Sequence, residues 1–316
     1  MTDLFESKDV APMLIAENKP PFNSPDYIYE LKFDGIRCIA YLDKEKTILR
    51  NKRNKDVTAI YPELSQMHRQ LKRQKQKCVL DGEIFVFYSN RTDFFETQRR
   101  SLMTNPFRIE LASKKMPVSF TAFDILYLNG SLLTGKPLIE RKDKLEKAIS
   151  ESSRLSVSRY FEGNGIDLYA AAEKQGLEGI VAKKKRGFYY PGKRTKEWVK
   201  CKVLMDEDFV VCGYYHKDAY ASIILGMYDG DRLAYRSHVV MGVSKHDFKT
   251  ITSQREVSKE REYPDFPDFD KARWIAPVLV CSVKYMERTP GGGLRQPVFK
   301  GLRDDKIPQE CVDTGQ

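Results

Sequence analysis

The chain has 316 residues, with 54 Lys and Arg against 44 Asp and Glu, which gives a net charge of +10 at pH 7. This length allows two domains with separate cores, and the positive excess suits a polyanionic partner such as nucleic acid. The six cysteines are scattered without a Cys-x-x-Cys pair, which argues against a zinc ribbon or a disulfide framework. Because no apolar run reaches the ~18 residues that span a bilayer and the acidic N-terminus is not a signal peptide, we expect a cytoplasmic protein that binds no membrane.

The first strong pattern lies between Tyr27 and Leu42. Residues 27–33 alternate apolar and polar side chains, as in a half-buried strand. Asp34-Gly35 is typical of a tight turn, and residues 36–42 would form the returning strand. The pattern predicts a hairpin with Lys32 at a strand end. A lysine there can act as a nucleophile if burial or nearby cations lower its pKa from about 10.4, although a plain charged hairpin has the same pattern.

Strands and helices are mixed in the following residues, up to Lys202. Strands are predicted over residues 46–50, 78–88, 118–128, 179–183 and 197–202, with an acidic turn at 81–83 inside the second. Helices are predicted over residues 61–75, 94–103, 138–149 and 166–175, the last ended by Gly176. The basic end of the first helix is either a solvated face or a surface for phosphate. This mixture indicates an α+β domain and not a doubly wound parallel sheet.

The composition changes after Lys202. Strand patterns over residues 209–215, 222–229, 232–240 and 275–287 surround a helix predicted over 244–254. Five or so short strands with one helix are typical of an OB-fold, a small barrel that often binds nucleic acid. We therefore expect a first domain at residues 1–203, an OB-fold β-barrel domain at residues 204–316, and a hinge at residues 202–206.

Five segments place chemically active side chains along the chain. They are Glu30 to Arg37, Asp81-Gly82-Glu83, the strand around Phe123, Glu178 to Lys183, and Trp198 to Lys202. Lys200 and Lys202 share one face of a strand because side chains alternate, so both can reach the same phosphate. Each segment alone has an ordinary explanation as a charged turn, a core aromatic or surface lysines. Together they offer the nucleophile, carboxylates, cations and aromatic ring that nucleotidyl transfer needs.

The segment Lys32-Phe33-Asp34-Gly35-Ile36-Arg37 resembles the nucleotidyl-lysine motif of ATP-dependent DNA ligases, RNA ligases and mRNA capping enzymes. The other motifs of that superfamily follow in the same order, from Glu30 to Lys306, and the likeness is greatest to the ligase domain of bacterial end-joining DNA ligases. The resemblance implies a nucleotidyltransferase (adenylation) domain before the OB-fold domain, with ATP and Mg²⁺ or Mn²⁺ as cofactors. Since only 31 residues precede Lys32 and no cysteine zinc module is present, we do not expect NAD.

The resemblance also implies a role for each matching residue. Lys32 would be the nucleophile. Lys200 and Lys202 would hold phosphate and help to activate Lys32. Glu178 and Glu83 would bind the metal, and Glu83 would also bind the ribose hydroxyls. The expected nucleotide and phosphate contacts are Glu30, Arg37, Arg53, Phe123, Val181 and, from a Pro-Gly-Lys-Arg loop, Arg194. Arg303 and Lys306 of the C-terminal motif would orient the departing pyrophosphate.

The expected partner is nicked or broken duplex DNA, joined by a monomer, with a Ku-type end-binding protein as a further partner. An RNA ligase or a capping guanylyltransferase with the same lysine is an alternative, because the base-pocket residues do not distinguish adenine from guanine. A non-catalytic nucleic-acid-binding protein would also explain the charge and the OB-like domain. Such a protein would not need the set of active side chains, namely Lys32, Glu83, Glu178, Lys200 and Lys202.

Overall fold

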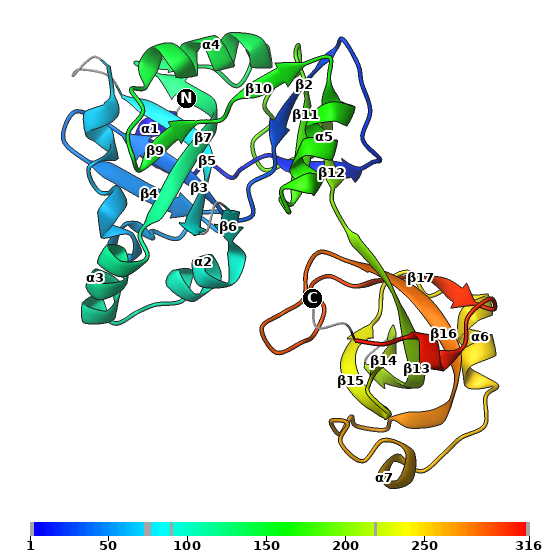
Figure 1. Cartoon of the computed structure of the whole chain (residues 1–316). Helices are drawn as coiled ribbons and strands as arrows, with labels where there is room; N and C mark the ends of the chain where they lie inside the picture. The colour runs from blue at the N-terminus through cyan, green and yellow to red at the C-terminus, as the bar shows by residue number, and fades with distance from the viewer. Residues whose placement is uncertain (1–2, 73–76, 89–90, 218–219, 314–316) are drawn as a thin grey trace. The chain divides into compact units, whose positions relative to one another are not determined.

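The computed structural model describes residues 3–72, 77–88, 91–217 and 220–313, and the chain divides into two compact units, Met1–Val203 and Leu204–Gln316 (Figure 1). We call them unit 1 and unit 2. Within the described ranges, no helix is both long enough and apolar enough to cross a membrane.

Unit 1 contains two β-sheets with short helices packed against them (Figure 1). Its elements in chain order are α1 (Leu4–Ser7), β1 (Leu14–Asn18), β2 (Tyr27–Leu31), β3 (Ile36–Leu42), β4 (Thr47–Asn51), η1 (Thr58–Ile60), η2 (Pro62–Leu64), η3 (Met67–Gln70), β5 (Cys78–Tyr88), β6 (Arg91–Asp93), α2 (Phe94–Ser101), α3 (Pro106–Lys115), β7 (Val118–Leu128), β8 (Ser131–Leu132), α4 (Leu138–Ala148), β9 (Leu155–Val157), β10 (Tyr160–Glu162), α5 (Gly165–Lys174), β11 (Gly179–Lys184) and β12 (Arg194–Lys202).

The first sheet of unit 1 has the strand order β1-β12-β11-β2-β10. The second has the order β4-β3-β5-β7-β8, with β6 paired to β5 and β9 paired to β7. Among the described strands, the pairs β1–β12 and β7–β9 are parallel and the other pairs are antiparallel. The predicted α+β class is therefore confirmed, and the sheets are not the parallel, doubly wound kind.

The predicted hairpin between Tyr27 and Leu42 is wrong. Strand β2 pairs with β10 and β11 in the first sheet, whereas β3 pairs with β4 and β5 in the second. The chain crosses between the sheets at Asp34-Gly35, where a Cβ on Gly35 would collide with the carbonyl oxygen of Ile84 in β5. Glycine is needed there for close passage over a neighbouring strand and not for a two-residue turn. Lys32 does follow a strand end directly, as expected.

The helix predicted over residues 61–75 is also wrong where the structure describes it. Three 3₁₀ turns, η1 to η3, occupy residues 58–70, and residues 73–76 lie outside the described ranges. Buried side chains recur at Tyr61, Leu64 and Met67, a spacing of three that matches the three residues per turn of a 3₁₀ helix. The acidic segment 81–83 is not a turn either, because β5 runs through it without a break.

The other elements predicted for unit 1 are present within a few residues of the expected bounds. They include β4, β7, α2, α4, β11, β12 and α5, after which Gly176 has a φ of +65°. Elements β1, α3, β9 and β10 were not predicted, and three of them are strands of only three to five residues.

Both faces of the second sheet are covered, so β3 is buried on both sides. Cys38 and Ala40 point into the core that the 3₁₀ turns and α4 close. Ile39 and Tyr41 point into the core between the two sheets, with Trp198 of β12 on its other side. Helix α5 covers the outer face of the first sheet. The two sheets therefore share a buried layer, and the side chains discussed below lie in it.

Unit 2 is a curled five-stranded antiparallel sheet in the order β15-β14-β13-β16-β17 (Figure 1). Its elements in chain order are β13 (Met205–Lys217), β14 (Tyr220–Asp229), β15 (Arg232–Val239), α6 (Lys245–Thr252), α7 (Lys259–Glu262), β16 (Arg273–Tyr285), β17 (Val298–Arg303) and η4 (Pro308–Glu310). Phe209 and Val211 face one core and Val210 and Cys212 the other, because side chains alternate along β13. Four of the five strands and α6 match the predicted OB-fold pattern, and β17 was not predicted.

The six cysteines are all buried and unbridged. Burial raises the pKa of each thiol. Unit 1 holds Cys38, Cys78 and Cys201, and unit 2 holds Cys212, Cys281 and Cys311.

Helix α4 carries two charged side chains on its buried face, Arg141 and Lys142, beside Leu138 and Leu145. Arg141 binds Asp124 of β7 with two contacts, from Nε to Oδ1 at 2.7 Å and from Nη2 to Oδ2 at 2.8 Å, and both side chains are 0% exposed. Arg141 also donates to the carbonyl oxygen of Gly187 at 3.0 Å. This pair joins α4, the second sheet and the loop before β12.

We expect Arg141→Ala to lower the free energy of unfolding by about 3–5 kcal/mol, because it leaves the Asp124 carboxylate buried without its partner. Denaturant-induced unfolding of the full chain measures this loss. The control is Lys147→Ala on the same helix, which breaks an exposed pair with Asp143 and should change stability by less than about 1 kcal/mol. Equal losses in the two variants would contradict the structural role given to Arg141.

Candidate active site

A pocket lies between the two sheets of unit 1, where β2, β3, β5, β7, β11 and β12 approach one another. It is lined by Ile15, Glu30, Leu31, Lys32, Phe33, Arg37, Glu83, Phe123, Val181, Lys183 and Trp198. Six of the residues singled out from the sequence are therefore brought together: Glu30, Lys32, Arg37, Glu83, Phe123 and Val181.

Lys32, the candidate nucleophile, contacts Glu178 at the edge of this pocket. Its Nζ lies 2.5 Å from Oε2 of Glu178, and Nζ of Lys202 lies 3.4 Å from Oε1 of the same carboxylate. The backbone fixes the same residues, because the N–H of Lys32 donates to the carbonyl oxygen of Gly179 at 2.9 Å. The Glu178 carboxylate thus contacts two of the three predicted catalytic lysines, Lys32 and Lys202.

The third lysine, Lys200, lies on the same strand face as Lys202. The two flank Cys201, which is buried on the opposite face, as the alternation of a strand requires. Lys200 pairs across the sheet with Val181, and Lys202 with Gly179. Burial lowers the pKa of Lys202, the nearby Lys32 and Lys200 lower it further, and Glu178 opposes the change.

Glu30 is buried in the pocket wall between two lysines. Its Oε1 lies 2.5 Å from Nζ of Lys142, and its Oε2 lies 2.9 Å from Nζ of Lys183. Burial alone would raise the pKa of Glu30, but the two lysines lower it below its ordinary value. Burial lowers the pKa of Lys183 to about 8, with Glu30 opposing. Glu30 is therefore a charged group that is fixed in place before any ligand arrives.

Two cations approach the ring of Phe123. The guanidinium of Arg37 lies 4.5 Å from the ring centroid, and Nζ of Lys183 lies 4.4 Å from it. Arg37 is also held by Asp81, from Nε to Oδ1 at 2.5 Å and from Nη2 to Oδ2 at 2.6 Å. Phe123 itself has no partner on β5, because the register with β7 shifts between Asp81 and Gly82. Such a bulge directs one side chain out of the ladder, here into the pocket.

Glu83 and Glu178 are the candidate metal ligands. The pKa of Glu83 is raised to about 8, chiefly by burial; the charges of Arg37 and Lys32 oppose this change, and the charge of Glu178 adds to it. No group of three or more His, Cys, Asp and Glu side chains is arranged for a metal in the described ranges. Two carboxylates fit Mg²⁺ nevertheless, because this ion keeps several waters and binds substrate phosphates.

Seven residues singled out from the sequence do not line this pocket. Glu178, Lys200 and Lys202 lie at its edge, as described above, and the other four lie elsewhere. Arg53 is exposed in the turn after β4, and Arg194 is exposed at the start of β12, where its Nη1 donates to the carbonyl oxygen of Ile15 at 2.7 Å. Arg303 and Lys306 belong to unit 2 and contact carboxylates of that unit. Nε of Arg303 donates to Oδ1 of Asp305 at 2.7 Å, and Nζ of Lys306 lies 2.6 Å from Oδ2 of Asp208.

Sequence reasoning assigned no role to the residues that hold the predicted ones in place, namely Asp81, Lys142, Lys183, Tyr189 and Trp198, although Asp81, Lys183 and Trp198 lie in segments that it singled out. One signal was available for Lys142. It falls on the apolar side of the helix pattern 138–149, and a charge at such a position needs a buried partner. No comparable signal exists for Tyr189, whose hydroxyl donates to Oδ2 of Asp81 at 2.6 Å from a loop 108 residues away.

Comparison with known proteins gives matches over both units. The family model described as ATP dependent DNA ligase domain matches residues 12–202, and that of the ATP dependent DNA ligase C terminal region matches residues 216–306. The SPbeta prophage-derived DNA ligase-like protein LigB of Bacillus subtilis is 32% identical over 93% of this chain and 99% of its own length. The multifunctional non-homologous end joining DNA repair protein LigD of Mycobacterium tuberculosis is 31% identical over 98% of this chain.

A solved structure of mycobacterial DNA ligase D complexed with ATP and MES is also similar. It is 30% identical, covers 96% of this chain and 98% of that chain, and has a TM-score of 0.57. Since the matched part is 40% of LigD, the chain spans less than half the length of that relative.

Fold and family models thus define a nucleotidyltransferase domain followed by an OB-fold domain, and Lys32 lines a pocket of the first domain. The chain belongs to the ATP-dependent DNA ligase family.

The raised pKa of Glu83 predicts a pH-dependent stability. Glu83 ionises near pH 4.5 in the unfolded chain and near pH 8 in the folded chain, so folding favours its protonated form. The stability that the protonated Glu83 contributes is therefore complete below pH 4.5 and is lost as the pH rises to about 8. We expect Glu83→Gln, which mimics the protonated form, to gain stability over the wild type across this range, by up to about 4 kcal/mol. Unfolding free energies of both proteins at pH 5 to 9 measure the gain, and a difference that does not change with pH would contradict it.

Proposed function

We propose that this protein is an ATP-dependent DNA ligase that seals nicks and breaks in duplex DNA. The observation that carries the proposal is the position of Lys32, which follows β2 at the pocket edge and faces Glu178, Lys202 and Glu83. A nucleophilic lysine is activated by nearby cations such as Lys202, and carboxylates beside it can hold the metal that neutralises phosphate charge. The family membership and the names of the relatives support ATP and DNA as substrates.

In the proposed first step, Nζ of Lys32 attacks the α-phosphorus of ATP. A P–N bond forms, the bond from the α-phosphorus to the bridging oxygen breaks, pyrophosphate leaves, and the amine gives up its protons to solvent or a base. The AMP then passes from Lys32 to the 5′-phosphate at a nick, and the 3′-hydroxyl displaces it in the third step. Lys200 and Lys202 would neutralise phosphate charge, since both project from one strand face beside Lys32.

Glu178 and Glu83 would hold Mg²⁺, which when bound neutralises charge on the phosphates of ATP. In the structure, Glu178 forms an ion pair with Lys32. We propose that Glu178 gives up this ion pair when it binds Mg²⁺. Exchange of partners at Glu178 would therefore release the amine of Lys32 for attack.

Different side chains in the pocket wall are proposed to bind different parts of the nucleotide. Phe123 and Val181 offer apolar surface for the base, and Glu30 offers a fixed acceptor for its amino group. Arg37, Arg53 and Arg194 are proposed for the ribose and phosphates of ATP or DNA, as the family likeness suggests. Arg303 and Lys306 are proposed to orient pyrophosphate, for which they would have to leave Asp305 and Asp208.

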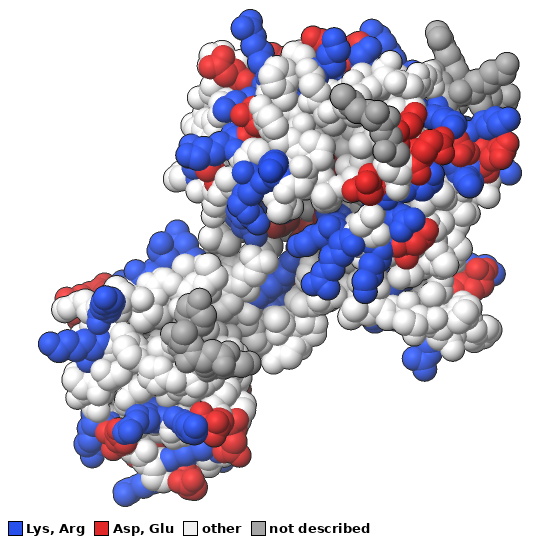
Figure 2. All heavy atoms as spheres, turned by 180° about the vertical axis from the view of Figure 1, so that it is seen from behind, with Lys and Arg blue, Asp and Glu red and all other residues white. Residues whose placement is uncertain are grey.

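DNA binding should depend on salt. Figure 2 shows Lys and Arg mixed with Asp and Glu on the visible face of each unit, without one continuous basic region. A net charge of +10 favours phosphate contacts that weaken as counterions are added.

The decisive experiment uses ATP labelled at the α-phosphate, with Mg²⁺, and detects label that stays on the denatured protein. We expect labelling by ATP and none by GTP or NAD. Lys32→Ala should lose the label completely, because no other amine occupies its place. A chase with nicked duplex DNA should then discharge the label from the wild type.

Lys196→Ala is the matched control, since Lys196 is an exposed lysine on β12, outside the pocket; it should label like the wild type. Arg303→Ala should slow labelling while it still seals a nick that is already adenylated. Labelling by GTP alone would favour a capping guanylyltransferase, and discharge onto nicked RNA alone would favour an RNA ligase.

We further propose that the protein acts as a monomer in the cytoplasm, on the DNA of a bacterial nucleoid, and that a Ku-type end-binding protein brings it to broken ends. The support is the likeness to LigD, whose name includes non-homologous end joining. We expect Ku from the same organism to speed the joining of linear DNA by at least about tenfold at low protein concentration, because recruitment raises the local concentration of the ligase. If added Ku left the rate of joining linear DNA unchanged, the proposal of a Ku-type partner would be wrong.

A further inference from the structure

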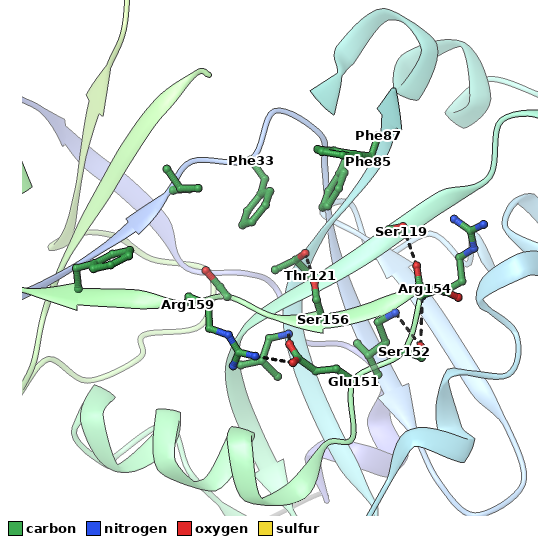
Figure 3. A pocket seen from close by; sticks show the side chains of 16 residues that line it. Phe33, Phe85, Phe87, Ser119, Thr121, Glu151, Ser152, Arg154, Ser156 and Arg159 are labelled. Carbon is green, nitrogen blue, oxygen red and sulfur yellow. Dashed lines mark hydrogen bonds and ion pairs between the residues drawn. The ribbon is translucent and has the colours of Figure 1, made fainter. Parts of the chain in front are cut away.

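A second hollow in unit 1 adjoins the nucleotide pocket, and we call it the aromatic groove (Figure 3). It has a volume of about 410 Å³ and lies over β5, β7 and β9. Leu31 and Phe33, the residues on either side of Lys32, line both the groove and the nucleotide pocket. The proposed reaction uses no other residue of the groove.

Two strands run from the nucleotide pocket into the groove. On β5, Glu83 lines the pocket, and Phe85 and Phe87 line the groove. On β7, Phe123 lines the pocket, and Thr121 and Ser119 line the groove. Because alternate residues of a strand share one face, these side chains form a continuous surface. A strand of nucleic acid with its end at Lys32 can therefore continue into the groove.

Aromatic rings are exposed in the groove. Phe87 is 57% exposed and Phe161 is 53% exposed. Phe33, which follows Lys32 in sequence, stacks on Phe85 with ring centroids 5.1 Å apart and an interplanar angle of 10° (Figure 3). Exposed aromatic side chains of this kind are the platforms on which proteins stack unpaired bases.

Cations and hydroxyls complete the lining. The guanidinium of Arg154 makes no ion pair or hydrogen bond with any described residue. Nη2 of Arg159 is held by Glu151 at 2.6 Å, so one positive charge is left over in the groove. The hydroxyls of Ser156 and Thr121 lie 2.6 Å apart. An arginine without a described partner, in a groove lined by aromatic rings, suits a phosphate of a strand whose bases are stacked.

We propose that the aromatic groove binds unpaired nucleotides of the DNA strand whose end is joined at Lys32, so that imperfectly paired ends are held for ligation. This inference rests on the proposed ligase function and specifies its substrate. Fully paired DNA does not fit the chemistry as well, because the faces of a paired base are covered by its neighbours in the stack. The bases would stack on Phe87 and Phe161, and Arg154 would bind a phosphate of the same strand.

The test measures binding of the full chain, without ATP or Mg²⁺, to two fluorescent duplexes by anisotropy. One is nicked and fully paired, and the other carries three unpaired thymidines at the nick. Phe87→Ala should weaken binding of the tailed duplex by about 5- to 100-fold, the range for loss of one stacked base. Arg154→Ala should weaken it by about 10- to 100-fold, the range for loss of one hydrogen bond to a charged group. The affinity of both variants for the paired duplex should stay within about twofold of the wild type.

Matched controls come from the same unit. Phe87→Tyr keeps the aromatic face and should bind the tailed duplex like the wild type. Phe107→Ala removes a ring that is 77% exposed on α3, outside the groove, and should change neither affinity. Labelling by ATP in each groove variant checks that the nucleotide pocket is intact.

Three results would overturn the proposal. They are equal losses for the paired and tailed duplexes, no loss for either, and a loss for the tailed duplex in Phe87→Tyr as large as in Phe87→Ala. The ligase function is tested separately by ATP labelling. If label is absent while the tail-specific loss is present, the ligase proposal fails and the groove is still a site for unpaired nucleic acid.

Discussion

The carboxylate of Glu178 is shared by Lys32 and Lys202, and the position of the candidate nucleophile depends on this contact. The backbone supports it on both sides, because the carbonyl oxygen of Glu178 accepts from the N–H of Val203 and that of Gly179 accepts from the N–H of Lys32. Gly179 has a φ of +129°, and a Cβ there would collide with the carbonyl oxygen of Cys201. Glycine at this position lets β2, β11 and β12 meet closely enough for three charged side chains to share one site.

Behind that contact, each buried carboxylate of unit 1 has its own cation. Glu30 has Lys142 and Lys183, Asp81 has Arg37, and Asp124 has Arg141. Such pairs add little net stability, since desolvation costs nearly as much as attraction returns, but removal of one partner is costly. Their effect is to fix side-chain positions in the layer between the sheets. A nucleotide would therefore meet charges that are already oriented, which is how electrostatic catalysis avoids reorganisation during the reaction.

Much of this arrangement was predictable from local sequence, because strong periodicity marks long elements. Strand β7 and helices α2, α4 and α5 were found within a few residues of their bounds, and six of the predicted site residues line one pocket. The failures have a common cause. Asp34-Gly35 has the composition of a hairpin turn, but tertiary contact with Ile84 makes it a crossing between sheets. Likewise, the partners of Arg37 and Glu30 come from distant segments, which no window along the chain can reveal.

The burial of every cysteine has a practical consequence for studies of motion. Thiol reagents modify the thiolate, so six buried thiols with raised pKa values leave the native protein nearly inert toward them. A single cysteine introduced on the surface of either unit could then carry a dye without removal of the native ones. Three native thiols lie in each unit, so mass spectrometry of alkylated peptides can follow the opening of each unit as denaturant is added.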